Sequence, residues 1–322
     1  MTDTPSTVHS TQRLPLIDVA RGGALVAMAI YHFTWDLEFF GYVERGTTAY
    51  GGWKLFARLI AGSFLFLVGI SLVLGHGKGI RWRSFGKRLA MIAAAAGLIT
   101  LATYFATPDR FIFFGILHNI AVSSVFGLLF VRLPAIISLM AGLVILFAGP
   151  YLTGPLFDHS LLLWLGLFTV PVTSNDLVPF FPWTACVLFG ISAAKLATDR
   201  GMIPRLATIY RGENRLGKIL SFGGRHSLAV YHLHQPLLIG LVNLASLLVP
   251  ANVTHSPASV IRDCKQTCVR TDTPEFCARY CQCVVDELVA TDLLQSLPSS
   301  RSPGDLRPEI RAITNSCAEA HR

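Results

Sequence analysis

Charged residues are scarce in this chain. Asp, Glu, Lys and Arg make up 14% of its 322 residues, whereas a soluble globular domain usually carries about a quarter. Hydrophobic residues make up 52% of the sequence, and the mean hydropathy is +0.53. This balance argues against a soluble enzyme, a disordered chain or a nucleic-acid-binding protein.

The N-terminal segment lacks the features of a cleavable signal peptide. Residues 1–12 are polar and rich in Ser and Thr, with no short apolar segment and no small-residue cleavage site. We therefore expect a disordered N-terminus over residues 1–12. The first apolar run that follows should remain attached to the chain.

Basic residues and cysteines are distributed unevenly along the sequence. The net charge is +8, and before residue 251 there are 19 basic and 10 acidic residues, against 8 and 9 after it. Six of the seven cysteines lie beyond residue 263. We therefore expect two parts, a transmembrane domain over 13–250 and a Cys-rich tail over 251–322.

Seven apolar runs are long enough to cross a membrane. A hydrocarbon core of ~30 Å needs ~20 apolar residues in a helix. The apolar stretch 161–170 would reach only ~15 Å, so it predicts a half-helix or a buried cap. The sequence thus predicts an all-α, polytopic transmembrane helical bundle with about seven spans, at residues 14–33, 53–74, 85–106, 111–131, 135–152, 178–197 and 227–249.

Lys and Arg gather in two of the connecting loops. The loop at 78–88 holds five basic residues and no acidic residue, and the loop at 200–225 holds six basic residues. Loops of this kind stay in the cytoplasm. We therefore expect a multi-pass protein of the cell (inner) membrane, with the N-terminus inside and the tail extracytoplasmic. The first, third and fifth connections carry acidic residues instead (Asp36, Glu38, Glu44, Asp109, Asp158 and Asp176).

The first span is too polar for a plain membrane anchor. A charge near the bilayer centre costs at least ~2.5–3.5 kcal/mol, so it must face protein or water. Arg21 and His32 fall within ~20° of each other on a helix and ~16 Å apart along it. Asp18 and Asp36 lie three and four residues outside this pair, so one helix face presents all four. The alternative is that Asp18 and Arg21 only lock helix packing and that His32 hydrogen-bonds a neighbour.

Ionisable residues recur in other spans. His118 lies in the fourth span, Asp176 lies just before the sixth, and His234 lies in the seventh. On the predicted topology His32, His118 and Asp176 lie in the outer half of the membrane, and His234 lies near its middle. We expect a polar corridor whose inner mouth is basic, lined by Arg21, Arg88 and Arg225.

Four motifs resemble the bacterial relatives of the heparan-α-glucosaminide N-acetyltransferase catalytic domain. The spacing of Arg21 and His32 is also similar to the arginine–ten residues–histidine motif of the wider acyltransferase-three family. The resemblance covers roughly residues 10–250. Its motifs are Arg13-Leu-Pro-Leu-Ile-Asp18-Val-Ala-Arg21-Gly22, Phe114-Gly-Ile-Leu-His118, Ser174-Asn-Asp176-Leu-Val-Pro-Phe-Phe-Pro182-Trp183 and Gly224-Arg-His-Ser-Leu-Ala-Val-Tyr-His-Leu-His234-Gln-Pro236.

The resemblance implies acyl transfer across the membrane. In these families acyl-CoA is used on the cytoplasmic side, and the acyl (acetyl) group ends on a sugar or similar acceptor on the far side. The eukaryotic enzyme places its key histidine in the loop after the first span. Residues 34–75 of this chain contain no histidine, so His32 is the candidate. No permanently bound cofactor and no metal are expected beside the acyl-CoA co-substrate.

Acyl transfer from a thioester needs a base and donors for the developing oxyanion. A neutral imidazole suits the base near pH 7, and His32 is our candidate. Asp36 or Asp176 could orient its ring, and His118 or His234 could be the oxyanion donor or a supporting residue. Candidates for binding the CoA phosphates are Arg21, Arg225 and Arg88, with Asp18 in a structural role.

Two other functions fit the same residues. Buried His, Asp and Arg also build proton relays, so a proton-coupled transporter is an alternative. A membrane scaffold whose Cys-rich tail binds a partner is a third hypothesis. The sequence indicates membrane lipids as partners and no nucleic acid; it is compatible with an oligomer but gives no indication of one.

The tail cysteines follow a helical spacing. Cys264 and Cys268 are four residues apart, as are Cys277 and Cys281, which places each pair on one face of a helix. Two short antiparallel helices stapled by 264–281 and 268–277 would leave Cys283 and Cys317 for a third bridge. Six cysteines allow 15 pairings, and a zinc site is the alternative to disulfides.

Overall fold

The computed structural model describes residues 14–44, 46–209, 214–249, 256–269, 271–297 and 308–321. Within these ranges the chain forms helices and no strand, which confirms the all-α prediction. The predicted disordered N-terminus at 1–12 and the predicted domain boundary at 250 lie outside the described residues.

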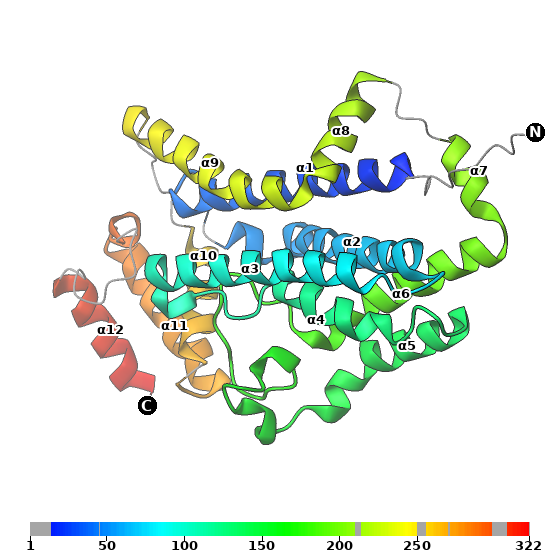
Figure 1. Ribbon diagram of the computed structural model, residues 1–322. Coiled ribbons are helices and arrows are strands. Elements are labelled where there is room, and N and C mark those ends of the chain that lie inside the picture. Colours follow the sequence, from blue (N-terminus) through cyan, green and yellow to red (C-terminus); the bar gives the residue numbers. More distant parts are fainter. Residues whose placement is uncertain are drawn as a thin grey trace, which may run out of the picture. The chain divides into compact units, whose positions relative to one another are not determined.

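The chain divides into two compact units. The first unit consists of the chain up to Ala27 and of Leu59–His232. The second unit consists of Met28–Arg58 and of the chain from Leu233 onward. Helices α1 (Pro15–Phe39), α2 (Gly51–His76) and α9 (Ser227–Leu248) each contribute residues to both units (Figure 1).

Six helices are long and apolar enough to cross a membrane, so the chain is a multi-pass membrane protein. They are α1, α2, α9 and three helices of the first unit: α3 (Trp82–Ala106), α5 (Ala135–Leu152) and α6 (Phe180–Asp199). The loop predicted at 200–225 instead contains two short helices, α7 (Met202–Ile209) and α8 (Arg215–Arg225).

The predicted fourth span is shorter than expected. Helix α4 covers Ile116–Leu128, and its 13 residues reach only ~20 Å. The residues before it form the 3-10 turn Pro108–Arg110 and an irregular segment. The backbone N–H groups of Asn175 and Val178 donate to the carbonyls of Arg110 and Phe114, at 2.9 and 3.1 Å. These bonds place the loops before α4 and after α5 on one side of the unit. Helix α4 therefore carries the chain across the unit, as the predicted span does.

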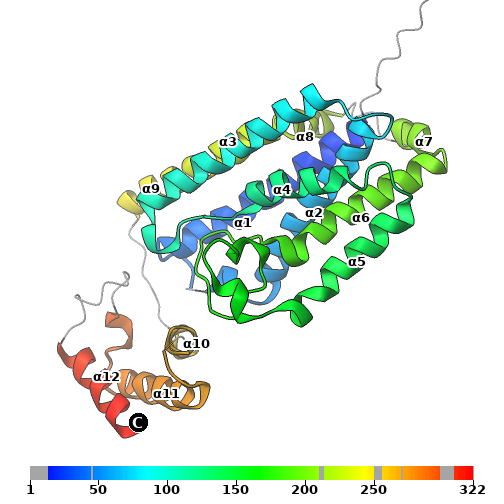
Figure 2. The ribbon, with the colours of Figure 1, turned by 60° about the horizontal axis from the view of Figure 1, so that its bottom comes forward.

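Helix α6 is the centre of the first unit. Ala185, Val187, Leu188 and Ile191 on this helix are fully buried. Helix α5 runs alongside α6, and α4 packs on another side of it (Figure 2). The backbones of α2 and α6 come so close that a Cβ atom on Gly69 would overlap the carbonyl oxygen of Val187.

The loop between α5 and α6 covers this core. The sequence predicts either a half-helix or a buried cap at 161–170. The half-helix is wrong, because only the short 3-10 turn Leu163–Leu165 is present there. The Trp164 ring lies 5.7 Å from the ring of Phe114 and 6.1 Å from that of Phe180. The stretch therefore lies over the core as a cap, which is the second form that the sequence predicts, but only Leu167 of it is buried and Leu161 and Val170 are exposed.

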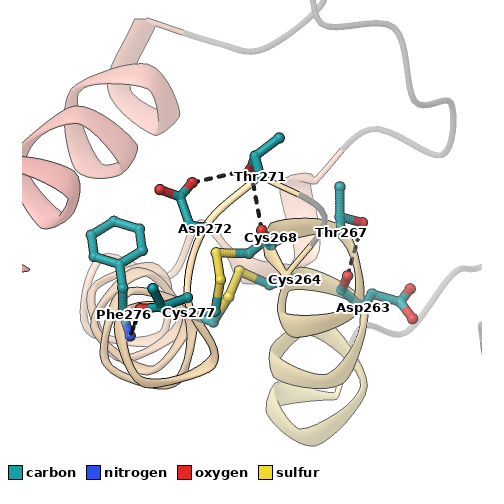
Figure 3. The surroundings of a disulfide bond; sticks show 10 residues. Asp263, Cys264, Thr267, Cys268, Thr271, Asp272, Phe276 and Cys277 are labelled. Carbon is teal, nitrogen blue, oxygen red and sulfur yellow. Dashed lines mark hydrogen bonds between the residues drawn. A yellow bond between two sulfur atoms is a disulfide. The ribbon is translucent and has the colours of Figure 1, made fainter. Parts of the chain in front are cut away.

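The tail lies in the second unit and forms three helices: α10 (Pro257–Cys268), α11 (Pro274–Ala290) and α12 (Pro308–His321). Disulfides join Cys264 to Cys281 and Cys268 to Cys277, and both link α10 to α11 (Figure 3). A third joins Cys283 on α11 to Cys317 on α12. These are the three bridges that the cysteine spacing predicts.

The start of the tail contacts the loop between α1 and α2. The Ser256 hydroxyl donates to the Glu44 carboxylate, and the Arg262 guanidinium lies 4.7 Å from the centre of the Tyr50 ring. Hydrogen bonds from Ser256 and Ser259, with the nearby Arg262 charge, lower the pKa of Glu44. The tail is therefore docked on the membrane domain's own loop within the second unit.

Candidate functional site

Two histidines from distant parts of the sequence meet in the second unit. The rings of His32 on α1 and His234 on α9 lie 5.0 Å apart, edge to face. The ring of Tyr31 lies 5.8 Å from that of His32 on the other side. The structure thus brings together two of the residues that the sequence predicts for the site.

A buried carboxyl–amide pair completes this histidine cluster. The Gln235 side-chain amide donates to Oδ1 of Asp36 at 2.8 Å, and Asp36 is 0% exposed. Within the described part of the chain, Oδ2 of Asp36 and Oε1 of Gln235 are buried and have no hydrogen-bond partner. Within the described residues the Asp36 carboxylate is therefore bonded to Gln235.

Sequence reasoning missed Gln235 as a site residue. It directly follows His234 in an apolar span, and a polar amide at that depth is itself a signal. Its partner Asp36 lies 199 positions away in the sequence. No local pattern predicts such a contact.

The loop after α1 is held by a carboxylate. Glu38 accepts hydrogen bonds from the backbone N–H of Gly46 and Thr48, at 2.6 and 2.9 Å, and from the Thr48 hydroxyl at 2.7 Å. Gly46 has φ +80, a left-handed conformation that glycine adopts without strain. This bracing fixes the end of α1 that carries His32 and Asp36.

A second polar cluster lies in the first unit, near the start of α1. The Asp18 carboxylate lies 3.6 Å from the Arg21 guanidinium and 3.5 Å from that of Arg225. Arg21 also donates to the hydroxyl of Ser71. The structure therefore joins two of the three predicted phosphate-binding arginines through Asp18.

The third predicted arginine lies beside the same serine. Ser71, His76 and Arg88 line a cavity of about 20 Å³ between α2, α3 and α4. This volume holds about one water molecule. Arg21 therefore bonds Ser71, and Arg88 lines the same small cavity from a different helix.

His118 and Asp176 hold the start of α4. Nδ1 of His118 accepts from the Gly115 N–H at 3.2 Å, so its Nε2 carries the proton toward the Thr100 hydroxyl at 3.1 Å. The Asp176 carboxylate accepts from the Ile116 N–H at 2.9 Å. Burial raises the pKa of Asp176 to about 6, although this hydrogen bond opposes the rise. Both ring nitrogens of His118 are therefore already used in structural contacts.

No metal centre is formed by the part of the chain described above: no group of three His, Cys, Asp or Glu side chains lies close enough to hold an ion. His232 lies within hydrogen-bonding distance of the Leu228 and Ala95 carbonyls, at 2.8 and 3.3 Å.

Comparison with known proteins assigns the family. The family described as "Heparan-alpha-glucosaminide N-acetyltransferase, catalytic" matches residues 13–236, more than half of the chain. This range includes both polar clusters and stops before the tail. No curated protein and no solved structure matches the chain. The chain belongs to the heparan-alpha-glucosaminide N-acetyltransferase catalytic family.

Proposed function

We propose that this protein is a membrane-embedded acyltransferase that moves an acetyl group from acetyl-CoA to a hydroxyl or amine of a sugar-like acceptor. The observation that carries the proposal is the meeting of His32 and His234 beside the buried Asp36–Gln235 pair. The family supplies the reaction class, and this cluster supplies groups suited to it.

In the proposed reaction His32 is the general base. Its neutral imidazole takes the proton from the acceptor O–H or N–H as the acceptor atom attacks the thioester carbonyl carbon. The new C–O or C–N bond forms, the C–S bond breaks, and the sulfur leaves with the bonding electrons. His32 then returns the proton to the CoA thiolate. His234 supports the step by donating toward the oxyanion or by sharing the proton with His32.

The Asp36–Gln235 pair is suited to hold the acceptor. Two buried acceptor atoms, Oδ2 of Asp36 and Oε1 of Gln235, lack hydrogen-bond donors within the described residues. Such atoms are costly to leave unpaired. An acceptor that carries hydroxyl or amine donors would satisfy both, and an apolar acceptor would satisfy neither.

The arginines around Ser71 are suited to hold the donor. Guanidinium groups match phosphate oxygens in paired hydrogen bonds, and acetyl-CoA carries several phosphates. Arg21, Arg88 and Arg225 would bind them, with Asp18 holding Arg21 and Arg225 in place. His118 and Asp176 would support the fold around α4 rather than act on the substrate.

The charge of the connections supports an orientation. The basic connections at 78–88 and 200–225 would lie in the cytoplasm, which places acetyl-CoA inside. The N-terminus would then be inside, and the disulfide-bonded tail would lie outside the bacterial inner membrane, where disulfides persist.

The direct test is acetyl transfer by the purified full-length protein in lipid nanodiscs. Radiolabelled acetyl-CoA is supplied with a panel of amino sugars and neutral sugars, and labelled product is counted. We expect His32→Ala to reduce transfer about 100-fold or more. The control His159→Ala changes an exposed loop histidine and should keep normal turnover. Arg88→Gln should raise KM for acetyl-CoA and leave kcat unchanged.

Normal turnover by a folded His32→Ala variant would contradict the proposed base. If the wild-type protein transfers no label but carries protons in sealed vesicles, the transporter alternative replaces the enzyme. Folding of each variant is checked by size-exclusion chromatography and thermal unfolding.

A further inference from the structure

Helix α8 packs on α1 through glycines. A Cβ atom on Gly22 of α1 would overlap the Leu220 carbonyl, and one on Gly224 of α8 would overlap the Asp18 carbonyl. Gly217, Ser221 and Gly224 form the buried face of α8. Because these residues are small, the two backbones approach closely.

The opposite face of α8 is apolar and exposed. Leu216, Ile219 and Phe222 are 64%, 68% and 65% exposed. At ~100° per residue these three side chains lie within a ~120° arc that faces away from the glycine face. No other described element covers them.

One edge of α8 is basic. Arg215, Lys218 and Arg225 lie within a ~80° arc that overlaps one margin of the apolar face at Arg215, and α8 contains no acidic residue. Arg225 is paired with Asp18. Within the described residues neither Arg215 nor Lys218 has an ion-pair partner.

The position of α8 is at one end of a membrane-spanning helix. Gly224 lies against the Asp18 backbone and Leu220 lies against Gly22, and both of these α1 residues are in its first turns. With 11 residues, α8 reaches only ~17 Å and cannot cross the membrane itself. It stands at a steep angle to α1, as an element lying along the membrane surface would (Figure 1).

We propose that α8 is an interfacial helix that binds anionic phospholipid. Its apolar face enters the acyl region of the leaflet at the start of α1, and Arg215 and Lys218 bind lipid phosphates. A lipid monolayer offers an apolar layer and negative charge side by side, which matches the two exposed faces. A second copy of α8 would present the same positive edge and be repelled.

Binding of short-chain phosphatidylglycerol to the purified full-length protein tests the proposal. We expect Arg215→Glu combined with Lys218→Glu to weaken binding about tenfold or more. The control pair Arg110→Glu with Arg279→Glu makes the same charge change at exposed positions elsewhere and should bind as the wild type does. Equal binding by both double variants, or no preference over phosphatidylcholine, would overturn the proposal.

A spin label gives an independent result that does not need the charge variant to fold. Ile219→Cys in a Cys186→Ala background is labelled with a nitroxide and reconstituted in vesicles containing phosphatidylglycerol. The proposal predicts greater accessibility to oxygen, which enters the lipid, than to a water-soluble nickel complex. A water-exposed label, or a label paired closely with that of a second copy, would overturn it.

Discussion

The histidines of this protein have different environments, and these separate their roles. His118 uses both ring nitrogens to brace α4, and His232 lies against two backbone carbonyls. His32 and His234 instead face each other beside a buried carboxyl. Residue type alone therefore does not identify the reactive histidines, whereas their contacts favour this pair.

Replacing Gln235 by Leu removes the one hydrogen bond that the Asp36 carboxylate receives within the described residues. Because Asp36 is fully buried, we expect Gln235→Leu to lower the free energy of unfolding by about 1–3 kcal/mol and to reduce kcat. The matched control is Gln282→Leu, which removes an exposed Gln–Asp hydrogen bond and should change stability little. Equal unfolding midpoints for the two variants in a thermal melt would count against the buried pair.

Asp176 predicts a pH dependence of stability. Its pKa is raised to about 6 in the folded protein, so between about pH 4 and 6 the folded state binds more protons than the unfolded state. The contribution of Asp176 to the free energy of unfolding is therefore fully present below about pH 4 and is lost as the pH rises through about 6. Asp176→Asn keeps an oxygen for the Ile116 N–H and has no such titration.

The measurement is the melting temperature of both proteins from pH 4 to 7. The melting temperature of the wild type should fall relative to that of Asp176→Asn as the pH rises across this range. The fall should correspond to a loss of about 2–3 kcal/mol in the free energy of unfolding. A difference that stays constant or rises with pH would show that Asp176 is not held as described.

At the scale of elements, helix crossings depend on single glycines. Gly69 lies where α2 crosses α6, and an added Cβ would overlap backbone, which cannot move aside as a side chain can. We expect Gly69→Ala to cost at least about 3 kcal/mol or to abolish folding. Gly97→Ala is the control, because an added Cβ there meets nothing. Similar yield and melting temperature for the two variants would contradict this crossing.

Local patterns explain which elements could be predicted from the sequence. Long apolar runs give the spanning helices, and the spacing of the tail cysteines gives their three bridges, since both are properties of one or two helices. The shortening of α4 depends on bonds between residues more than 60 positions apart. The positive charges of α8 predict a loop, because a basic connection between two spans has the same composition.

Candidate residues are harder to predict than helices, since a site needs contacts between distant segments. The sequence indicates His32, Asp36 and His234 because ionisable groups are costly in a membrane. It does not indicate which of them meet. The links of Asp36 to Gln235 and of Arg21 to Ser71 required the structure.

At the scale of the whole molecule, the location of the tail can be tested on intact cells. We expect its six cysteines to react with a membrane-impermeant maleimide only after an impermeant reductant opens the three disulfides. Cys186, which lies within the apolar helix α6, should stay unlabelled. Labelling that requires cell lysis would place the tail inside and reverse the proposed orientation.

The central claim is that His32 and His234 act as one chemical unit, and a double-mutant cycle measures this most directly. Acetyl transfer is compared for the wild type, His32→Ala, His234→Ala and the double variant, with folding confirmed for each. Groups that act together are not additive, so the double variant should lose no more activity than His32→Ala alone. Losses that multiply, or full activity in either single variant, would contradict the account.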